Sequence, residues 1–130
     1  MNLPFKIGIS PTLNIRGLIA TRDIKKDSKI EQSPVILIEK EYEEFLEKTN
    51  FKYYYFKYDK KNYALSLGYI SIVNHSFAPN CNTIIDYKNQ LFTLVAIKNI
   101  NKGDELTIEY MGREEAKKYP ELFDFNKGIE

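Results

Sequence analysis

The sequence lacks tryptophan and contains one cysteine and one histidine among its 130 residues. Because the cysteine, Cys81, has no second thiol in the chain, no intramolecular disulfide can form. One histidine and one cysteine are too few to complete a Cys/His zinc site, which uses several such ligands. We therefore expect no bound metal and a reducing compartment.

Long hydrophobic runs are also missing. An apolar run such as residues 35–38 (VILI) is far short of the roughly 20 residues that a membrane-spanning helix needs. The first residues lack the charged-then-apolar layout of a signal peptide. We expect a protein that works without a membrane and is not exported by a classical signal, located in the cytoplasm or nucleus or directed to a host.

An excess of charge of either sign is absent as well. The 19 Lys and Arg residues nearly balance the 18 Asp and Glu residues, which leaves a net charge of +1. This balance argues against a generic nucleic-acid binder, because such proteins usually carry a strongly basic surface. With 43% hydrophobic and 14% aromatic residues the chain has enough bulk for one core, so we expect a single domain over residues 1–130.

The apolar stretches that are present are short, rich in β-branched and aromatic residues, and separated by turn residues. This pattern predicts a mainly β fold, a β-rich member of the α+β class, with a hairpin turn at residues 88–89. Two segments with helical spacing, residues 39–48 and 113–123, predict short helices. The expected strands lie near residues 6–9, 17–21, 34–39, 53–58, 82–87, 90–97 and 105–109.

Two parts of the chain are similar to each other. Residues 20–30 (ATRDIKKDSKI) and 96–106 (AIKNINKGDEL) both read as a strand, a basic turn and a second strand. Asp27 occupies the position of Gly103 in this alignment, and both residue types tolerate the left-handed backbone conformation of a tight turn. Either two unrelated turns converged on common turn chemistry, or the fold contains two pseudo-symmetric β-halves.

Three segments are unusual for a purely structural β domain. Residues 14–20 (NIRGLIA) place a glycine where a turn enters a strand, and residues 73–81 (VNHSFAPNC) place the single histidine among small polar residues. Residues 103–112 (GDELTIEYMG) form a strand that ends in a tyrosine beside a glycine. Taken alone, the histidine and the tyrosine are more often structural, and the glycine is a turn residue.

In this order, the three segments resemble the SET-domain protein-lysine methyltransferases. Residues 16–24 look like the opening motif of the family, residues 74–81 resemble its signature, and residues 105–110 resemble its closing motif. Between them, residues 54–69 are similar to the stretch before the signature in small bacterial and viral members. The resemblance covers nearly the whole chain and identifies it as a minimal SET domain.

The resemblance implies a fold of several small β-sheets with short helices and a threaded C-terminal segment. It also exposes two departures from the family. Asn14 stands where the opening motif usually has a glycine, although asparagine is the next most tolerant residue for positive φ. The tail at residues 113–130 lacks the family's zinc-binding cysteines. We therefore expect this helical tail to act as the lid of the site through an aromatic residue, and the candidates are Tyr119, Phe123 and Phe125.

The resemblance further implies S-adenosylmethionine as cofactor and the ε-amine of a lysine, in a histone or another protein or peptide, as methyl acceptor. Cofactor binding would fall to the backbone at residues 15–17 together with Asn74, His75 and Tyr110. Tyr110 and Tyr54 would be the catalytic tyrosines that line a narrow channel. The predicted site residues are Ile15, Arg16, Gly17, Asn74, His75 and Tyr110 for the cofactor, and Tyr54, Tyr55, Thr83 and Ile108 for the channel.

The sequence leaves two alternatives open. A SET-like domain that has lost catalysis would only bind a peptide or the cofactor, and the substitution at Asn14 favours it slightly. A module that stacks single-stranded nucleic acid is supported by residues 52–61 (KYYYFKYDKK), which interleave aromatic and basic side chains. The neutral charge and the ordered motifs oppose it, so we expect a monomer or homodimer that does not bind nucleic acid directly.

Overall fold

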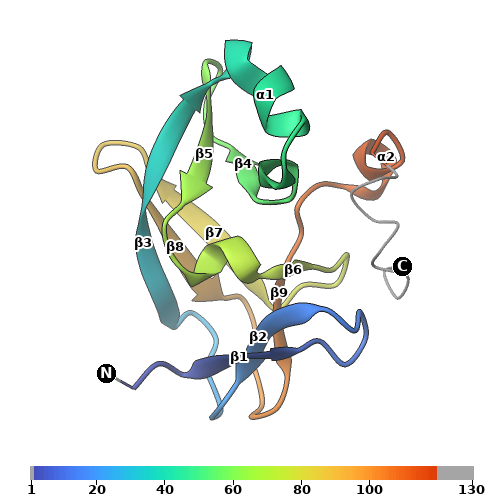
Figure 1. The fold of residues 1–130 in the computed structure, drawn as a ribbon. Helices are drawn as coiled ribbons and strands as arrows, with labels where there is room; N and C mark the ends of the chain where they lie inside the picture. The colour runs from blue at the N-terminus through green and yellow to red at the C-terminus, as the bar shows by residue number, and fades with distance from the viewer. Residues whose placement is uncertain (1, 120–130) are drawn as a thin grey trace.

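A computed structural model describes residues 2–119 of the chain. Its first sheet has the strand order β1-β2-β9-β6, and β6 runs parallel to β9 while the other pairs are antiparallel. These strands are β1 (Phe5–Ile9), β2 (Arg16–Ala20), β9 (Glu105–Ile108) and β6 (Asn74–His75). Each of the three unusual sequence segments therefore contributes a strand to one sheet (Figure 1).

The second sheet is antiparallel throughout, with the order β4-β5-β3-β8-β7. Its long strand β3 (Lys29–Glu39) pairs with β8 up to Pro34 and with β5 from Val35 onward. The change of partner falls at a proline, which has no backbone N–H to contribute to a ladder. The remaining strands are β4 (Tyr55–Lys57), β5 (Asn62–Ser66), β7 (Cys81–Asp86) and β8 (Leu91–Ala96).

Helical segments are short. The predicted helix at residues 39–48 is confirmed as a 3₁₀ turn, η1 (Lys40–Tyr42), followed by α1 (Glu43–Glu47). Two further 3₁₀ turns are η2 (Asn50–Tyr53) and η3 (Tyr69–Ile72). The tail forms α2 (Arg113–Ala116), and the end of the helix predicted at 113–123 lies outside the described residues. Figure 1 places α1 at the opposite end of the molecule from β1 and β2.

The mainly β fold predicted from the sequence is confirmed, and three local expectations need correction. Residues 53–58 do not form one strand, because η2 extends to Tyr53 and β4 covers Tyr55–Lys57. The turn between β7 and β8 spans residues 87–90 rather than 88–89. There Asp86 accepts a hydrogen bond from the backbone of Asn89, and Gln90 adopts a φ of 54°. Strands β5 and β6 had no matching prediction.

The two similar sequence segments are equivalent in the structure. Ile24 and Ile100 exchange two backbone hydrogen bonds of 2.8 Å across an antiparallel bridge. Asp27 and Gly103 both have left-handed φ values, 72° and 95°. Their amides make matching bonds, both 2.8 Å, from Asp27 to the carbonyl of Ala96 and from Gly103 to the carbonyl of Ala20. The interpretation as two pseudo-symmetric halves is therefore favoured, and Ile24 and Ile100 are both buried in the core.

The core lies between the two sheets. Its largest fully buried side chains include Leu18 and Leu106 of the first sheet, Ile70 of η3, and Phe92 and Leu94 of β8. Burial of such aliphatic and aromatic side chains contributes about 1.5–3 kcal/mol each relative to exposure. The packed core thereby fixes β2, β6 and β9 against one another. Within residues 2–119, no helix is long and apolar enough to cross a membrane.

Candidate active site

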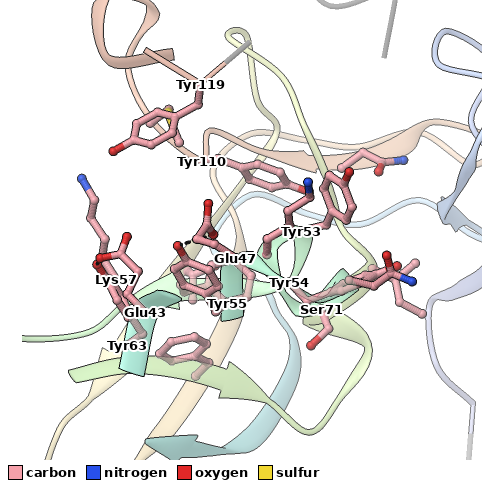
Figure 2. Close-up of a pocket in the computed structure, with 18 of the residues that line it drawn as sticks. Glu43, Glu47, Tyr53, Tyr54, Tyr55, Lys57, Tyr63, Ser71, Tyr110 and Tyr119 are labelled. Carbon is pink, nitrogen blue, oxygen red and sulfur yellow. Dashed lines mark hydrogen bonds between the residues drawn. The ribbon is translucent and has the colours of Figure 1, made fainter. Parts of the chain in front are cut away.

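A cavity of about 880 Å³ lies between the first sheet, the segment from α1 to β4, and the tail (Figure 2). Its wall combines aromatic rings with a few polar groups, which is typical of sites for small molecules. Most of the residues that the sequence singled out line this cavity, although they come from distant parts of the chain. They are Ile15, Arg16, Tyr54, Tyr55, Asn74, Thr83 and Tyr110.

The other three predicted residues lie beside the cavity. Gly17 is buried in β2 behind the wall, and Ile108 belongs to the hydrophobic core with 4% of its surface exposed. His75 is 2% exposed and lines a second cavity of about 720 Å³. All three lie in β2, β6 or β9, within two residues of a side chain that lines the cavity, namely Arg16, Asn74 or Tyr110.

The loop that enters β2 has the backbone shape that the sequence anticipated at Asn14. This residue adopts a φ of 57°, in the left-handed region where asparagine is favoured after glycine. The loop is closed by hydrogen bonds from the amide of Ser10 to the carbonyl of Ile15 at 2.7 Å and from the amide of Asn14 to the carbonyl of Ser10 at 3.0 Å. Asn14 therefore adopts a left-handed conformation that glycine also permits.

Tyr110 follows β9 and is held from two sides. Its hydroxyl donates a hydrogen bond to the carbonyl of Val73, and its amide donates to Nδ1 of His75 at 3.0 Å. Its ring packs edge-on against Phe56, with the centroids 6.5 Å apart. Burial raises the pKa of the hydroxyl, with smaller contributions from Glu105 and Tyr54. The hydroxyl thus stays protonated, and its proton is used by Val73, so its oxygen lone pairs are the groups left for a ligand.

His75 is the residue that ties the signature segment to the closing one. Its ring lies edge-on to Phe77, with centroids 4.2 Å apart, and the guanidinium of Arg113 sits 4.4 Å from the centroid of Phe77. Burial lowers the pKa of His75 to about 4, and the nearby charge of Arg113 adds to this effect. The ring is therefore neutral at pH 7, as its acceptor role toward the amide of Tyr110 requires.

We expect the stability of the protein to fall as the pH is lowered from about 6.5 to about 4. In this window the unfolded chain binds a proton at His75 while the folded chain does not, so acid favours unfolding. The loss from this residue should approach about 3 kcal/mol. Chemical denaturation of the wild type and His75→Gln at pH 7 and pH 4.5 measures it. An equal pH dependence in both proteins would contradict the assignment.

Tyr54 and Tyr55 both line the cavity, whereas alternation along a single strand would let only one of two neighbouring side chains face it. Tyr54 caps η2 with a non-strand conformation (φ −126°, ψ −14°), and strand alternation therefore does not separate the two side chains. Tyr55 donates a hydrogen bond of 2.9 Å to Glu47 and packs on the ring of Tyr63 at 4.7 Å. Burial and the contact with Glu47 raise the pKa of Tyr55, so it also stays neutral.

Thr83 contributes a polar atom that has no partner within the described part of the chain. Its hydroxyl oxygen Oγ1 is buried and accepts or donates no hydrogen bond among residues 2–119. Because buried polar groups are normally satisfied, an unpaired hydroxyl on a cavity wall is a natural contact for a bound molecule or water. Ile108, which was also predicted to line the channel, lies in the core instead.

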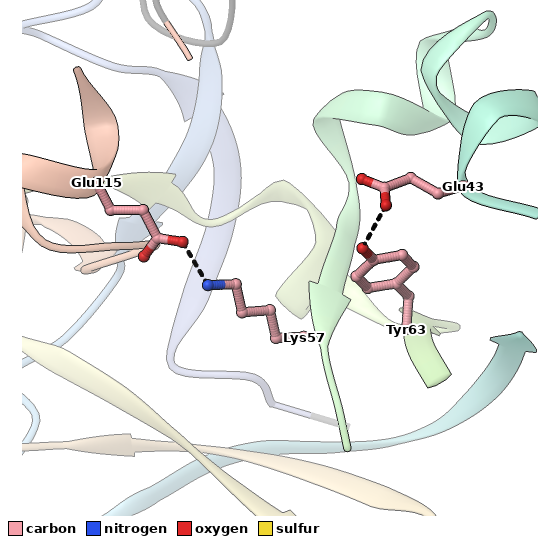
Figure 3. Close-up of polar contacts among 4 residues, drawn as sticks. All are labelled: Glu43, Lys57, Tyr63 and Glu115. Atoms are coloured by element: carbon pink, nitrogen blue, oxygen red, sulfur yellow. Dashed lines mark hydrogen bonds and ion pairs between the residues drawn. The ribbon is translucent and has the colours of Figure 1, made fainter. Parts of the chain in front are cut away.

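Sequence reasoning missed the wall of the cavity nearest α1. Glu43 accepts a hydrogen bond of 2.7 Å from Tyr63, and Glu115 of the tail forms an ion pair with Lys57 of β4 (Figure 3). Burial is the main cause that raises the pKa of Tyr63 to about 12, and the hydrogen bond to Glu43 raises it further. The glutamates of α1 look like a solvated helix face in the sequence. Only the position of α1 above β4 and β5 turns two of them toward the cavity.

The tail reaches the cavity through Glu115 and Tyr119, which both line it. In Figure 2, Tyr119 lies on the opposite side of the cavity from Tyr63. The other aromatic residues considered for the lid, Phe123 and Phe125, lie outside the described residues.

The residues of this cavity fit the cofactor that the sequence resemblance implied. Asn74 is only 6% exposed yet lines the cavity, and Arg16 lines it as well, with its carbonyl oxygen 3.0 Å from the amide nitrogen of Asn74. Aromatic rings and the apolar Ile15 and Ile72 complete the wall. A nucleoside linked to an amino acid offers both an aromatic face and charged groups, and this lining provides partners for both.

The β-rich fold, with its opening, signature and closing segments joined in one sheet beside an aromatic cavity, defines the class of this protein. A model of the SET domain family matches residues 15–111. The chain belongs to the SET domain family.

The chain is also similar to two individual proteins. It is 31% identical over 96 residues to a Schizosaccharomyces pombe histone-lysine N-methyltransferase specific for lysine 37 of histone H3, an alignment that covers 73% of this chain and 65% of that protein. The chain thus spans slightly less than two thirds of the length of this curated relative. It is also similar to the crystal structure of a candidate histone methyltransferase of Plasmodium falciparum, with 28% identity and a TM-score of 0.65. That match covers 85% of this chain and 96% of the other.

Proposed function

We propose that this protein is an S-adenosylmethionine-dependent protein-lysine N-methyltransferase that acts on a lysine of a histone or another protein. The observation that carries the proposal is the convergence of Asn74, Tyr54 and Tyr110 on one cavity in a chain of the SET domain family. The names of its relatives support the same reaction class.

The cofactor-binding role falls to the backbone at residues 15–17, to Asn74 and, through its backbone, to His75. When bound, S-adenosylmethionine supplies a methyl group on a positively charged sulfur. The residues named here bind and orient its amino-acid end and exclude water from it. Gly17 allows β2 to pass closely, since a Cβ there would lie 2.5 Å from a carboxylate oxygen of Glu105.

The aromatic wall of the cavity favours the neutral, reactive form of the acceptor amine. A free lysine has a pKa of about 10.4 and is almost entirely protonated at neutral pH. A channel lined by Tyr54, Tyr55 and Tyr110 removes water from the amine and so favours its neutral form. The lone pairs of the Tyr110 hydroxyl orient the amine, because the hydroxyl proton is already donated to Val73. Orientation of the two reactants accounts for much of the rate.

Incubation of the purified chain with labelled S-adenosylmethionine and a mixture of histones or lysate proteins tests the proposal. We expect label on lysine ε-amines, located by mass spectrometry. Binding of the cofactor without any labelled product would instead identify a catalytically inactive member of the family.

We propose that the tail from residue 113 onward covers the loaded site.

Asn74→Ala should weaken binding of S-adenosylmethionine. The loss of a buried amide that contacts a charged ligand group costs roughly 1–3 kcal/mol, or about fivefold to 150-fold in affinity. Isothermal titration calorimetry measures the effect. Asn82→Ala, at an exposed position of β7 outside the cavity, is the matched control. Equal affinities for wild type and Asn74→Ala would remove Asn74 from the site.

We expect the product to proceed beyond monomethyllysine. Thr83 occupies less volume than an aromatic residue on this wall, and Ile108 does not narrow the cavity because it lies in the core. Room therefore remains for an amine that already carries a methyl group. Mass spectrometry of an exhaustively methylated peptide should reveal di- or trimethyllysine, and Thr83→Tyr should restrict the product to monomethyllysine. Monomethyllysine alone from the wild type would contradict this expectation.

A further inference from the structure

The orientation of the Asn74 amide can be assigned from its surroundings. Its nitrogen Nδ2 lies 3.0 Å from the carbonyl oxygen of Arg16 and 2.7 Å from Oε2 of Glu105. Both neighbours are hydrogen-bond acceptors, so the atom between them must be the NH₂ group, and both of its hydrogens are used. Among residues 2–119, the side chain of Asn74 makes these two hydrogen bonds, and its carbonyl oxygen Oδ1 takes part in neither. Asn74 therefore offers the cavity an acceptor only.

Glu105 is itself held in place. Its other oxygen, Oε1, accepts a hydrogen bond from the hydroxyl of Ser10, a residue with 1% of its surface exposed. The same hydroxyl oxygen accepts from the amide of Leu13 at 3.1 Å, which leaves its proton for Glu105. The carboxylate is thus fixed at both oxygens and cannot turn away from Asn74.

The backbone at Gly17 completes this arrangement. A Cβ at this position would lie 2.5 Å from Oε2 of Glu105 and 2.7 Å from Nδ2 of Asn74. Real Cβ atoms do not approach other atoms so closely, so any side chain here would separate the two partners. Because Gly17 has no side chain, Glu105 and Asn74 can approach each other closely enough to form their hydrogen bond.

We propose that Glu105 is a positioning residue that makes Asn74 a receptor for a positively charged ammonium group. An amide without this partner could rotate and present its NH₂ group, which cannot accept a hydrogen bond from an ammonium. With Glu105 in place, Oδ1 accepts a charge-assisted hydrogen bond from the ligand. The inference rests on the proposed function, in which that ammonium is the α-amino group of S-adenosylmethionine.

The test compares two ligands by isothermal titration calorimetry on the whole chain: S-adenosylhomocysteine and its analogue without the α-amino group. We expect the wild type to prefer S-adenosylhomocysteine by about tenfold or more. Glu105→Ala should bring this ratio close to one. Glu105→Gln should restore part of the ratio, because its amide oxygen can accept from Asn74. Glu109→Ala, an exposed glutamate on the same segment, should keep the wild-type ratio.

Each result decides the proposal. A wild-type ratio in Glu105→Ala would overturn it, and so would equal binding of both ligands by the wild type. If Glu105→Ala does not fold, Ser10→Ala provides the decision: it frees one oxygen of the carboxylate and should lower the ratio severalfold, whereas an unchanged ratio overturns the proposal. A wild type that binds neither ligand would count against the proposed function itself, and is distinguishable from these outcomes.

Discussion

Tyr110→Phe should reduce methyl transfer by at least about 100-fold and leave the protein folded. The substitution removes the hydroxyl that orients the amine and keeps the ring, which continues to pack against Phe56 and His75. The hydrogen bond to the carbonyl of Val73 is also lost, so the free energy of unfolding should fall by about 1 kcal/mol. Initial rates with labelled methyl donor and thermal unfolding measure the two effects.

The matched control for this variant is Tyr42→Phe. Tyr42 is 45% exposed and does not line the cavity, so the loss of its hydroxyl should leave both the rate and the stability near wild type. Calorimetry with the cofactor separates binding from turnover in both variants. A Tyr110→Phe protein with full activity would exclude Tyr110 as a catalytic residue.

Truncation after Arg113 should have the second largest effect, with turnover reduced by about 100-fold. It removes Glu115 and Tyr119 from the cavity wall and leaves Lys57 without its ion-pair partner. Water would then reach the reacting groups, and the amine would regain its solvated, protonated form. Stability should change little, because α2 contains no buried residue.

Point substitutions locate the origin of that loss. Tyr119→Ala should reproduce part of it, whereas Glu114→Ala, in α2 and 89% exposed at its side chain, should behave as the wild type. Retention of full turnover by the truncated chain would show that another segment covers the site.

The local features of this fold were predictable because they depend on neighbouring residues. Short runs rich in β-branched and aromatic residues specify the strands, and the tolerance of Asn14, Asp27 and Gly103 for positive φ specifies the turns. The prediction failed for β6, a strand of two residues. Its pairing with β9 comes from a segment more than 30 positions away, and no local pattern announces it.

The acidic wall of the site shows the same limit. Glu43 and Glu47 read as a solvated helix face, yet both line the cavity, where Glu43 accepts a hydrogen bond from Tyr63 of β5 and Glu47 accepts one from Tyr55 of β4. The pairing of Lys57 with Glu115 joins residues 58 positions apart. Neither could be predicted from spacing, since helical periodicity reports which residues share a face and not what that face meets.

The sequence by itself determined the β-rich class, the resemblance to the SET domain family and the residues Asn74, His75 and Tyr110 as candidates, because short motifs and strand patterns are encoded by adjacent residues. The tertiary structure alone decided which way Asn74 points, that both Tyr54 and Tyr55 reach the cavity, and that Glu105 and Ser10 support the site. Those features depend on close approach between β2, β6 and β9, which only packing of the complete core can fix.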